Sequence, residues 1–135
     1  MPNEGEVSFS LFGEGVDAAV LTREIGLTPT SIGTEHTRRA TQTRWTFSLG
    51  RCDGGVLDVY EMASSLVIAL APHEERLLRV KAASGLEALL QVVLRLASGE
   101  AAAPVALGFD PDVVAFLGRV GAGVDVELDI LPDFG

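Results

Sequence analysis

The sequence predicts an α+β domain, with a four-stranded, mainly antiparallel sheet and helices packed on one face of that sheet. Two observations predict this class. In some segments apolar and polar residues alternate with period two, as in strands. Between them lie segments whose apolar residues recur every three or four positions, as in helices. Turns rich in glycine and proline separate them. At 135 residues the chain is long enough for one core, so we expect residues 1–135 to form a single domain.

The first predicted unit is a strand followed by a helix. Val7, Phe9 and Leu11 alternate with serines, as in a half-buried strand. After a glycine turn, Asp17 is placed to cap a helix, because its carboxylate can accept hydrogen bonds from the free N–H groups of the first turn. Gly26 is expected to end this helix.

Residues 28–43 are polar and without periodicity, so we expect a long loop there. Loops of more than about 12 residues in compact domains are often functional. The loop and the residue that follows it hold four of the few groups in the chain that can carry positive charge: His36, Arg38, Arg39 and Arg44. In the next strand Trp45, Phe47 and Leu49 alternate with polar residues, and we expect the aromatic pair in the core.

A helical region is predicted in the middle of the chain. Apolar residues recur every three or four positions from Val56 to Leu70, which is the stripe of an amphipathic helix. Pro72 interrupts the stripe, and proline is tolerated best at the first position of a new helix. We therefore expect a second helical segment over residues 73–83.

The last predicted elements are a strand, a helix and a strand. Residues 90–96 have apolar groups on both faces, which is typical of a central strand. Asp110-Pro111 predicts a helix start, and Gly121 its end. The final strand is expected to face the core with Val124, Val126, Leu128 and Ile130 and to face water with Asp125, Glu127 and Asp129.

Residues 7–27 and residues 90–121 share one order of elements. Each segment reads strand, turn and helix, then an aliphatic residue and glycine, and each is followed by an alternating strand. This order favours a β-α-β duplication and a ferredoxin-like arrangement. The repeat is weak in residue identity, so chance similarity stays an alternative.

The charge of the chain restricts its partners. Ten Lys and Arg against nineteen Asp and Glu give a formal net charge of −9. Nucleic acids and anionic membrane surfaces both attract basic proteins, so neither partner is expected. Complementary charge would speed encounter with a basic protein. The alternative is that the acidic surface serves solubility alone.

Several features indicate a reduced, cytoplasmic protein. Cys52 is the only cysteine, so no intrachain disulfide can form. The N-terminal residues lack the basic start and apolar run of a secretory signal. The longest apolar run, residues 66–71, is far shorter than the ~20 residues that span a bilayer.

No catalytic motif is present. The sequence contains no G-x-S-x-G turn, phosphate-binding loop, dinucleotide fingerprint or EF-hand loop. The two histidines, His36 and His73, are interpreted as surface groups. We therefore favour a non-enzymatic protein without a cofactor or metal, and leave an unfamiliar active site open.

The acids of the final strand allow three interpretations. Successive members of one strand face lie about 6.6–7 Å apart, which is too far for one cation to bridge without further ligands. A metal site at Asp125, Glu127 and Asp129 is therefore disfavoured. The row is either the solvated face of an amphipathic strand or a ridge that binds a basic partner.

Four segments together resemble a known family: Val7–Leu11, Ile25–Thr30, Arg44–Phe47 and Val120–Ile130. In this order and spacing they are similar to the bacterial family called domain of unknown function 4279. The resemblance implies the fold, a bacterial source and a loose association with immunity against toxins. The Arg- and Thr-rich middle loop and the Ala- and Leu-rich region around Pro72 depart from that family, so no partner specificity is carried over there.

Two functional hypotheses follow. The first is an immunity-type protein that neutralises a toxin or effector by stoichiometric binding through an acidic surface of Asp125, Glu127, Asp129 and Asp133. The second is a small-molecule sensing module that binds an anionic metabolite through residues 28–43, with His36, Arg38, Arg39 and Arg44 as its contacts.

Overall fold

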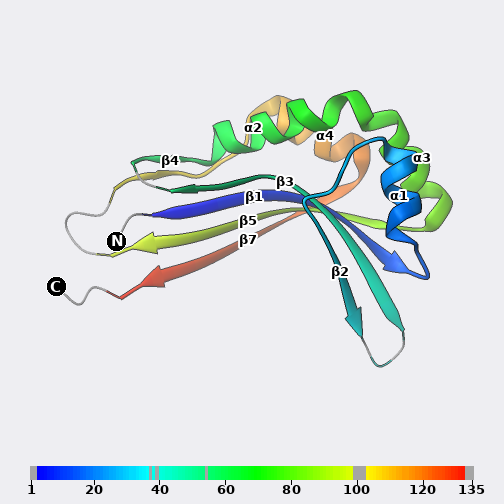
Figure 1. Cartoon of the computed structure of the whole chain (residues 1–135). Coiled ribbons are helices and arrows are strands. Elements are labelled where there is room, and N and C mark those ends of the chain that lie inside the picture. The colour runs from blue at the N-terminus through cyan, green and yellow to red at the C-terminus, as the bar shows by residue number, and fades with distance from the viewer. Residues whose placement is uncertain (1–2, 37, 39, 54, 99–102, 133–135) are drawn as a thin grey trace.

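A computed structural model describes residues 3–36, 38, 40–53, 55–98 and 103–132. A five-stranded sheet carries the helices on one face (Figure 1). The elements in chain order are β1 (Glu4–Glu14), α1 (Ala18–Ile25), β2 (Ser31–His36), β3 (Thr41–Asp53), β4 (Leu57–Asp58), α2 (Val59–Leu70), the 3-10 turn η1 (Ala71–His73), α3 (Glu74–Ser84), β5 (Glu87–Ala97), β6 (Val105–Ala106), α4 (Pro111–Val120) and β7 (Ala122–Leu131).

The strand order of the sheet is β2-β3-β1-β5-β7. β1 pairs antiparallel with β3 and β5, and β2 pairs antiparallel with β3, whereas β5 and β7 are parallel. The predicted α+β class with a mainly antiparallel sheet is thus confirmed. The predicted count of four strands was wrong, because β2 forms inside residues 28–43, which were expected to be a loop. Polar strands at a sheet edge carry no core-facing alternation that would mark them in sequence.

The expected ferredoxin-like arrangement and duplication are not confirmed. In the first unit the flanking strands β1 and β3 are antiparallel neighbours. In the second unit β5 and β7 are parallel neighbours joined through α4. The two units therefore share an order of elements but differ in how their strands pair.

Of the two aspartates predicted to cap a helix, only Asp17 does so through its carboxylate. Asp17 accepts a hydrogen bond from the Ala19 N–H at 2.9 Å, and Gly26 ends α1 in the left-handed conformation with φ 76°. Asp110 precedes α4 as predicted, but its carboxylate accepts from the Ser64 hydroxyl at 2.9 Å and caps no N–H group.

The middle helices depart slightly from prediction. α2 begins at Val59, capped by the carboxylate of Asp58, so Val56 lies outside the helix and is exposed. The residues between them form β4, which pairs with β6 in a small parallel sheet that the sequence did not indicate. The second helical segment after Pro72 is confirmed as α3.

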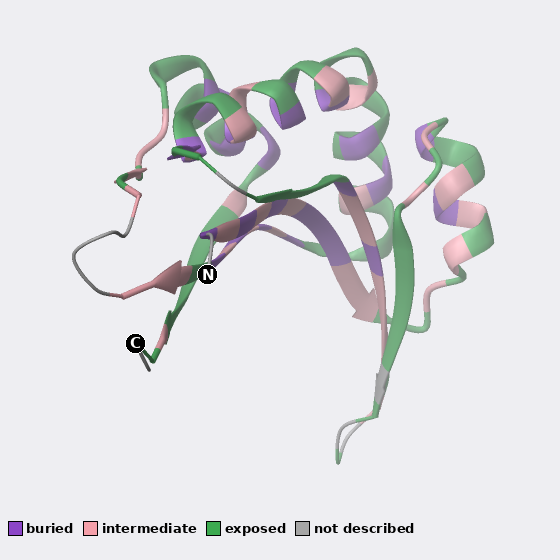
Figure 2. Ribbon diagram, turned by 60° about the vertical axis from the view of Figure 1, so that its left-hand side comes forward, coloured by how far each residue is buried: buried purple, intermediate pink, exposed green. Residues whose placement is uncertain are grey.

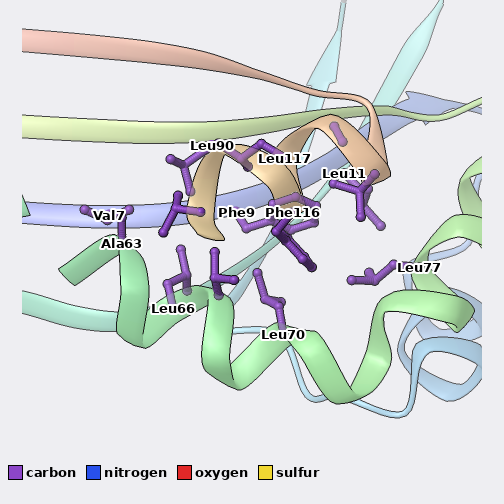
Figure 3. Close-up of a cluster of buried hydrophobic side chains, with 14 of the residues drawn as sticks. Val7, Phe9, Leu11, Ala63, Leu66, Leu70, Leu77, Leu90, Phe116 and Leu117 are labelled. Atoms are coloured by element: carbon purple, nitrogen blue, oxygen red, sulfur yellow. The ribbon is translucent and has the colours of Figure 1, made fainter. Parts of the chain in front are cut away.

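The core lies between the helices and the centre of the sheet. Val7, Phe9 and Leu11 of β1 are at most 3% exposed and point towards α2 and α4 (Figure 3). Phe116 of α4 meets Phe9 edge to face, with ring centroids 6.4 Å apart. Each such fully buried side chain stabilises the fold by about 1.5–3 kcal/mol. Phe116 thus joins helix α4 to the central strand β1.

Of the aromatic pair predicted in the core of β3, Trp45 is confirmed, whereas Phe47 is only half-buried. The Trp45 side chain is fully buried, and its indole N–H donates to the Thr22 hydroxyl of α1 at 3.2 Å. Because a buried N–H without a partner costs free energy, this bond fixes α1 over β3.

β7 is the main departure from the predicted core. Its row Val124, Val126, Leu128 and Ile130 lies on the helix side of the sheet, but the four side chains are 39–59% exposed. Figure 2 shows the end of this strand in the exposed colour, beside the buried centre of the sheet. The reason is positional, since β7 is an edge strand and the helices cover the strands further in.

Candidate functional site

The acidic residues of β7 form a row on the face of the sheet that carries no helix. Register with β5 places Asp125 beside Gln91, Glu127 beside Val93 and Asp129 beside Arg95. The alternate β7 residues pair with the buried row of β5, for example Val124 with Leu90, so the acids point the other way. We call Asp125, Glu127 and Asp129 the acidic row.

The acidic row is weakly compensated. All three side chains are exposed, and β5 brings one cation, Arg95, to the adjacent positions. No ion pair within 4 Å involves these acids among the residues that the structure describes. Three carboxylates and one neighbouring guanidinium leave a local excess of negative charge at the sheet edge, which attracts cations from solution.

The row does not form a metal centre. Within the described part of the chain, no three His, Cys, Asp or Glu side chains lie close enough together to hold a metal ion. Asp133, the fourth acid expected on this surface, lies outside the described residues.

The second predicted site is divided by the sheet. His36 ends β2 and pairs with Thr41, to whose hydroxyl its Nδ1 lies at 3.2 Å, and this puts it on the same face as Trp45. Arg44 points to the opposite face, where its guanidinium lies 5.7 Å from the ring centroid of Phe12. Within the expected loop, residues 31–36 form β2 and residues 41–43 begin β3, and these two strands do not bring His36 and Arg44 together.

The other two predicted contacts of that site are Arg38 and Arg39. Arg38 lies between β2 and β3 and is exposed, and Arg39 lies outside the described residues. The alternation that separates His36 from Arg44 follows from strand geometry once β2 exists. This separation could not be predicted from the sequence, because β2 was not predicted.

A groove that sequence reasoning missed lies at the other end of the sheet. It has a volume of about 390 Å³, lies between β3, β4 and α2, and exposes Cys52. Its apolar lining includes Val7, Leu49, Val56, Leu57 and Met62, and its acids are Asp53, Asp58 and Glu61. These residues come from three separate segments, so no local pattern could have assembled them.

An ion pair fixes α4 just before the chain turns into β7. Arg119 of α4 donates to Glu74 of α3 from Nε and Nη2, with the shortest N–O distance at 2.9 Å. This hydrogen bonding raises the pKa of the Arg119 guanidinium, and the charges of Glu74 and Asp112 act in the same direction. The other histidine, His73, ends η1 and is half-buried. Its Nδ1 lies 3.0 Å from the carbonyl of Ile25, so it joins η1 to α1 and is not the free surface group expected.

No helix in the described part of the chain is both long and apolar enough to cross a membrane.

Comparison with known proteins identifies the family. Searches of the curated proteins and of the solved structures gave no significant match. The profile of the family described as Domain of unknown function (DUF4279) matches residues 3–131, from the start of β1 to the end of β7, as the four sequence segments suggested. The chain therefore belongs to the DUF4279 family.

Proposed function

We propose that this chain is a non-enzymatic binding protein of the immunity type, which neutralises a basic toxin or effector in the cytoplasm by stoichiometric binding. The observation that carries the proposal is the acidic row, Asp125, Glu127 and Asp129, on an uncovered face at the edge of the sheet. The proposal also includes Asp133, which follows the end of β7 by two residues in the sequence.

Charge and apolar surface have separate roles in such an interface. A negative surface attracts a basic partner, speeds encounter and makes association sensitive to salt. Tight binding also needs desolvated apolar contacts. The exposed aliphatic row on the other side of the same strand supplies them within one element.

The proposal is tested with the product of the adjacent open reading frame. The two proteins are co-expressed and co-purified, and their binding is followed by titration calorimetry and stopped-flow kinetics. We expect 1:1 binding, and rescue of growth if the neighbouring product is toxic. No binding and no toxicity would contradict the proposal for this pair.

Charge reversal then locates the surface. Changing Asp125, Glu127 and Asp129 to Lys should slow association at least tenfold and weaken its dependence on salt. The matched control changes Glu14, Glu24 and Glu61 to Lys, three exposed acids of other elements with the same total charge change. Equal slowing in both variants would mean that net charge acts and that the acidic row is not the interface.

The anionic-metabolite alternative draws less support from the geometry, since the register of β2 and β3 puts His36 and Arg44 on opposite faces. A rise in melting temperature with an anionic metabolite that is lost in the Arg38→Ala, Arg39→Ala double variant would restore it.

A further inference from the structure

The free edge of β7 carries main-chain groups that are open to a partner. Among the residues that the structure describes, β7 is the last strand of the sheet, and β5 is its one neighbour. The carbonyl of Leu131 accepts from the Ser98 hydroxyl at 2.7 Å, on the side of β5. Main-chain groups of successive strand residues point to alternate sides, so those of Asp125, Glu127 and Asp129 also point to β5. The N–H and C=O groups of Val124, Val126, Leu128 and Ile130 consequently point to the open edge.

The residues with outward main-chain groups are the exposed aliphatic ones. Their side chains are 46%, 39%, 54% and 59% exposed, from Val124 to Ile130. Isolated exposed aliphatic residues are ordinary on protein surfaces, but four in one row beside unpaired strand groups form a template for another strand. The opposite edge differs, because β2 has six residues of which Ile32 is the only aliphatic one.

A second copy of this chain is a poor occupant of the edge. If two β7 strands paired antiparallel with matching sheet faces, the acidic row of one copy would lie directly opposite that of the other. Like charges in direct cross-strand positions are destabilising. A shift of the register by one residue would place acids against the aliphatic row, which is also unfavourable. The acidic row therefore protects the edge from self-pairing.

We propose that the free edge of β7 binds an extended segment of a basic protein as a sixth strand, in which Lys or Arg alternates with aliphatic residues. This inference rests on the proposed function and specifies how the partner docks. Main-chain hydrogen bonds from Val124, Val126, Leu128 and Ile130 hold the segment, and the two rows of side chains select it.

The distance between neighbouring strands would bring the side chains of such a segment into contact with both rows of β7. An added strand lies about 4.8 Å from β7, and side chains in opposite positions are about 4.5–5.5 Å apart at Cβ. Basic residues then lie beside Asp125, Glu127 and Asp129 on one face. Aliphatic residues of the partner cover the exposed row of β7 on the other face, which removes that row from water.

Two synthetic peptides test the docking mode on the native chain. The first alternates lysine and valine over seven residues, and the second has the same composition with the lysines and valines in separate blocks. We expect the alternating peptide to bind at least tenfold more tightly in titration calorimetry at low salt. Its binding should slow amide hydrogen exchange at Val124, Val126, Leu128 and Ile130. Equal affinity of the two peptides, or unchanged exchange at these amides, would overturn the strand-addition proposal.

A proline variant tests the main-chain contact directly. Val126→Pro removes one outward N–H group, and proline is tolerated in edge strands where the N–H faces solvent. The matched control Val126→Thr keeps the N–H group and nearly the same side-chain shape. We expect Val126→Pro to lose at least tenfold in affinity for the alternating peptide, and Val126→Thr to lose much less. If Val126→Pro fails to fold by circular dichroism, the exchange measurement on the native chain still decides the question.

The two proposals fail in different ways. If charge reversal of the acidic row abolishes binding of the neighbouring gene product while Val126→Pro binds it normally, the proposed function stands and strand addition is wrong. If the alternating peptide docks on β7 but charge reversal leaves the gene product bound, this gene product is not the partner of the edge. A native dimer in sedimentation that becomes a monomer in Val126→Pro would show that a second copy occupies the edge, which overturns the inference.

Discussion

The two strand–helix–strand units of this chain look alike in sequence and reach different structures. In the first unit α1 packs on the strand that closes it, β3, and the Trp45 indole bonds to Thr22 of that helix. In the second unit α4 contacts its closing strand β7 and also reaches β1, where Phe116 meets Phe9. β3 is also shielded by β2 on its outer side, whereas β7 has an open edge. The same alternation of apolar and polar residues therefore buries Trp45 in β3, although Leu49 of that strand is 57% exposed, and leaves the whole aliphatic row of β7 exposed.

The largest expected difference is in the free energy of unfolding, between variants of two residues that pair in the register of β5 and β7. Leu94 of β5 and Leu128 of β7 are neighbours on the same face, but Leu94 is fully buried and Leu128 is 54% exposed. Leu94→Ala should lower the free energy of unfolding by about 2–5 kcal/mol, because it leaves a cavity in the core. Leu128→Ala should cost less than about 1 kcal/mol, because little burial is lost. Urea denaturation of both variants measures this, and similar losses would show that β7 is covered in solution.

A second difference concerns the bond that ties α1 to β3. Thr22→Val keeps the side-chain shape but removes the hydroxyl that accepts from the buried Trp45 N–H. We expect a loss of about 1–3 kcal/mol, since the N–H group is left without a partner. Thr43→Val is the control, because its hydroxyl also bonds across the same region, to the carbonyl of Val16, but leaves no buried indole unpaired. A loss no larger than that of the control would contradict the role assigned to Thr22.

The aspartates that precede α1 and α4 should differ in their contribution to stability by a smaller amount. Asp17→Ala should destabilise the chain by about 1 kcal/mol, because Asp17 caps the Ala19 N–H of α1. Asp110→Ala should cost about 0.5 kcal/mol or less, since its carboxylate bonds to an exposed Ser64 hydroxyl and caps no N–H group. Melting temperatures of the two variants test the order, and a reversed order would show that Asp110 caps α4 in solution.

The smallest expected effect is a gain in stability within β7. Two carboxylates about 7 Å apart in water repel by about 0.6 kcal/mol before screening. Glu127→Gln removes the central charge of the acidic row and should stabilise the free chain by a few tenths of a kcal/mol at low salt, with the gain fading at high salt. Glu24→Gln, an exposed acid of α1 outside the row, serves as the control. A loss of stability would mean that Glu127 has a favourable partner in the folded chain.

Local sequence features specified most elements of the fold. Alternation predicted β1, β3, β5 and β7, and glycines 26, 85 and 121 mark helix ends where the chain takes left-handed backbone angles. These features act over a few residues, through side-chain direction and main-chain sterics, so they are visible in the sequence. The same local character explains why β2 and the short pair β4 and β6 were missed, since their pairing depends on partners far along the chain.

The family, the α+β class, the acidic charge and the position of the acidic row on one face of the last strand all follow from the order of residues along the chain. Which of the alternating strands are covered depends on the tertiary structure. It placed β7 at an edge, turned α4 towards β1, and put His36 and Arg44 on opposite faces. The physical reason is that alternation fixes the direction of a side chain relative to its own strand, while burial depends on what another segment places over that strand.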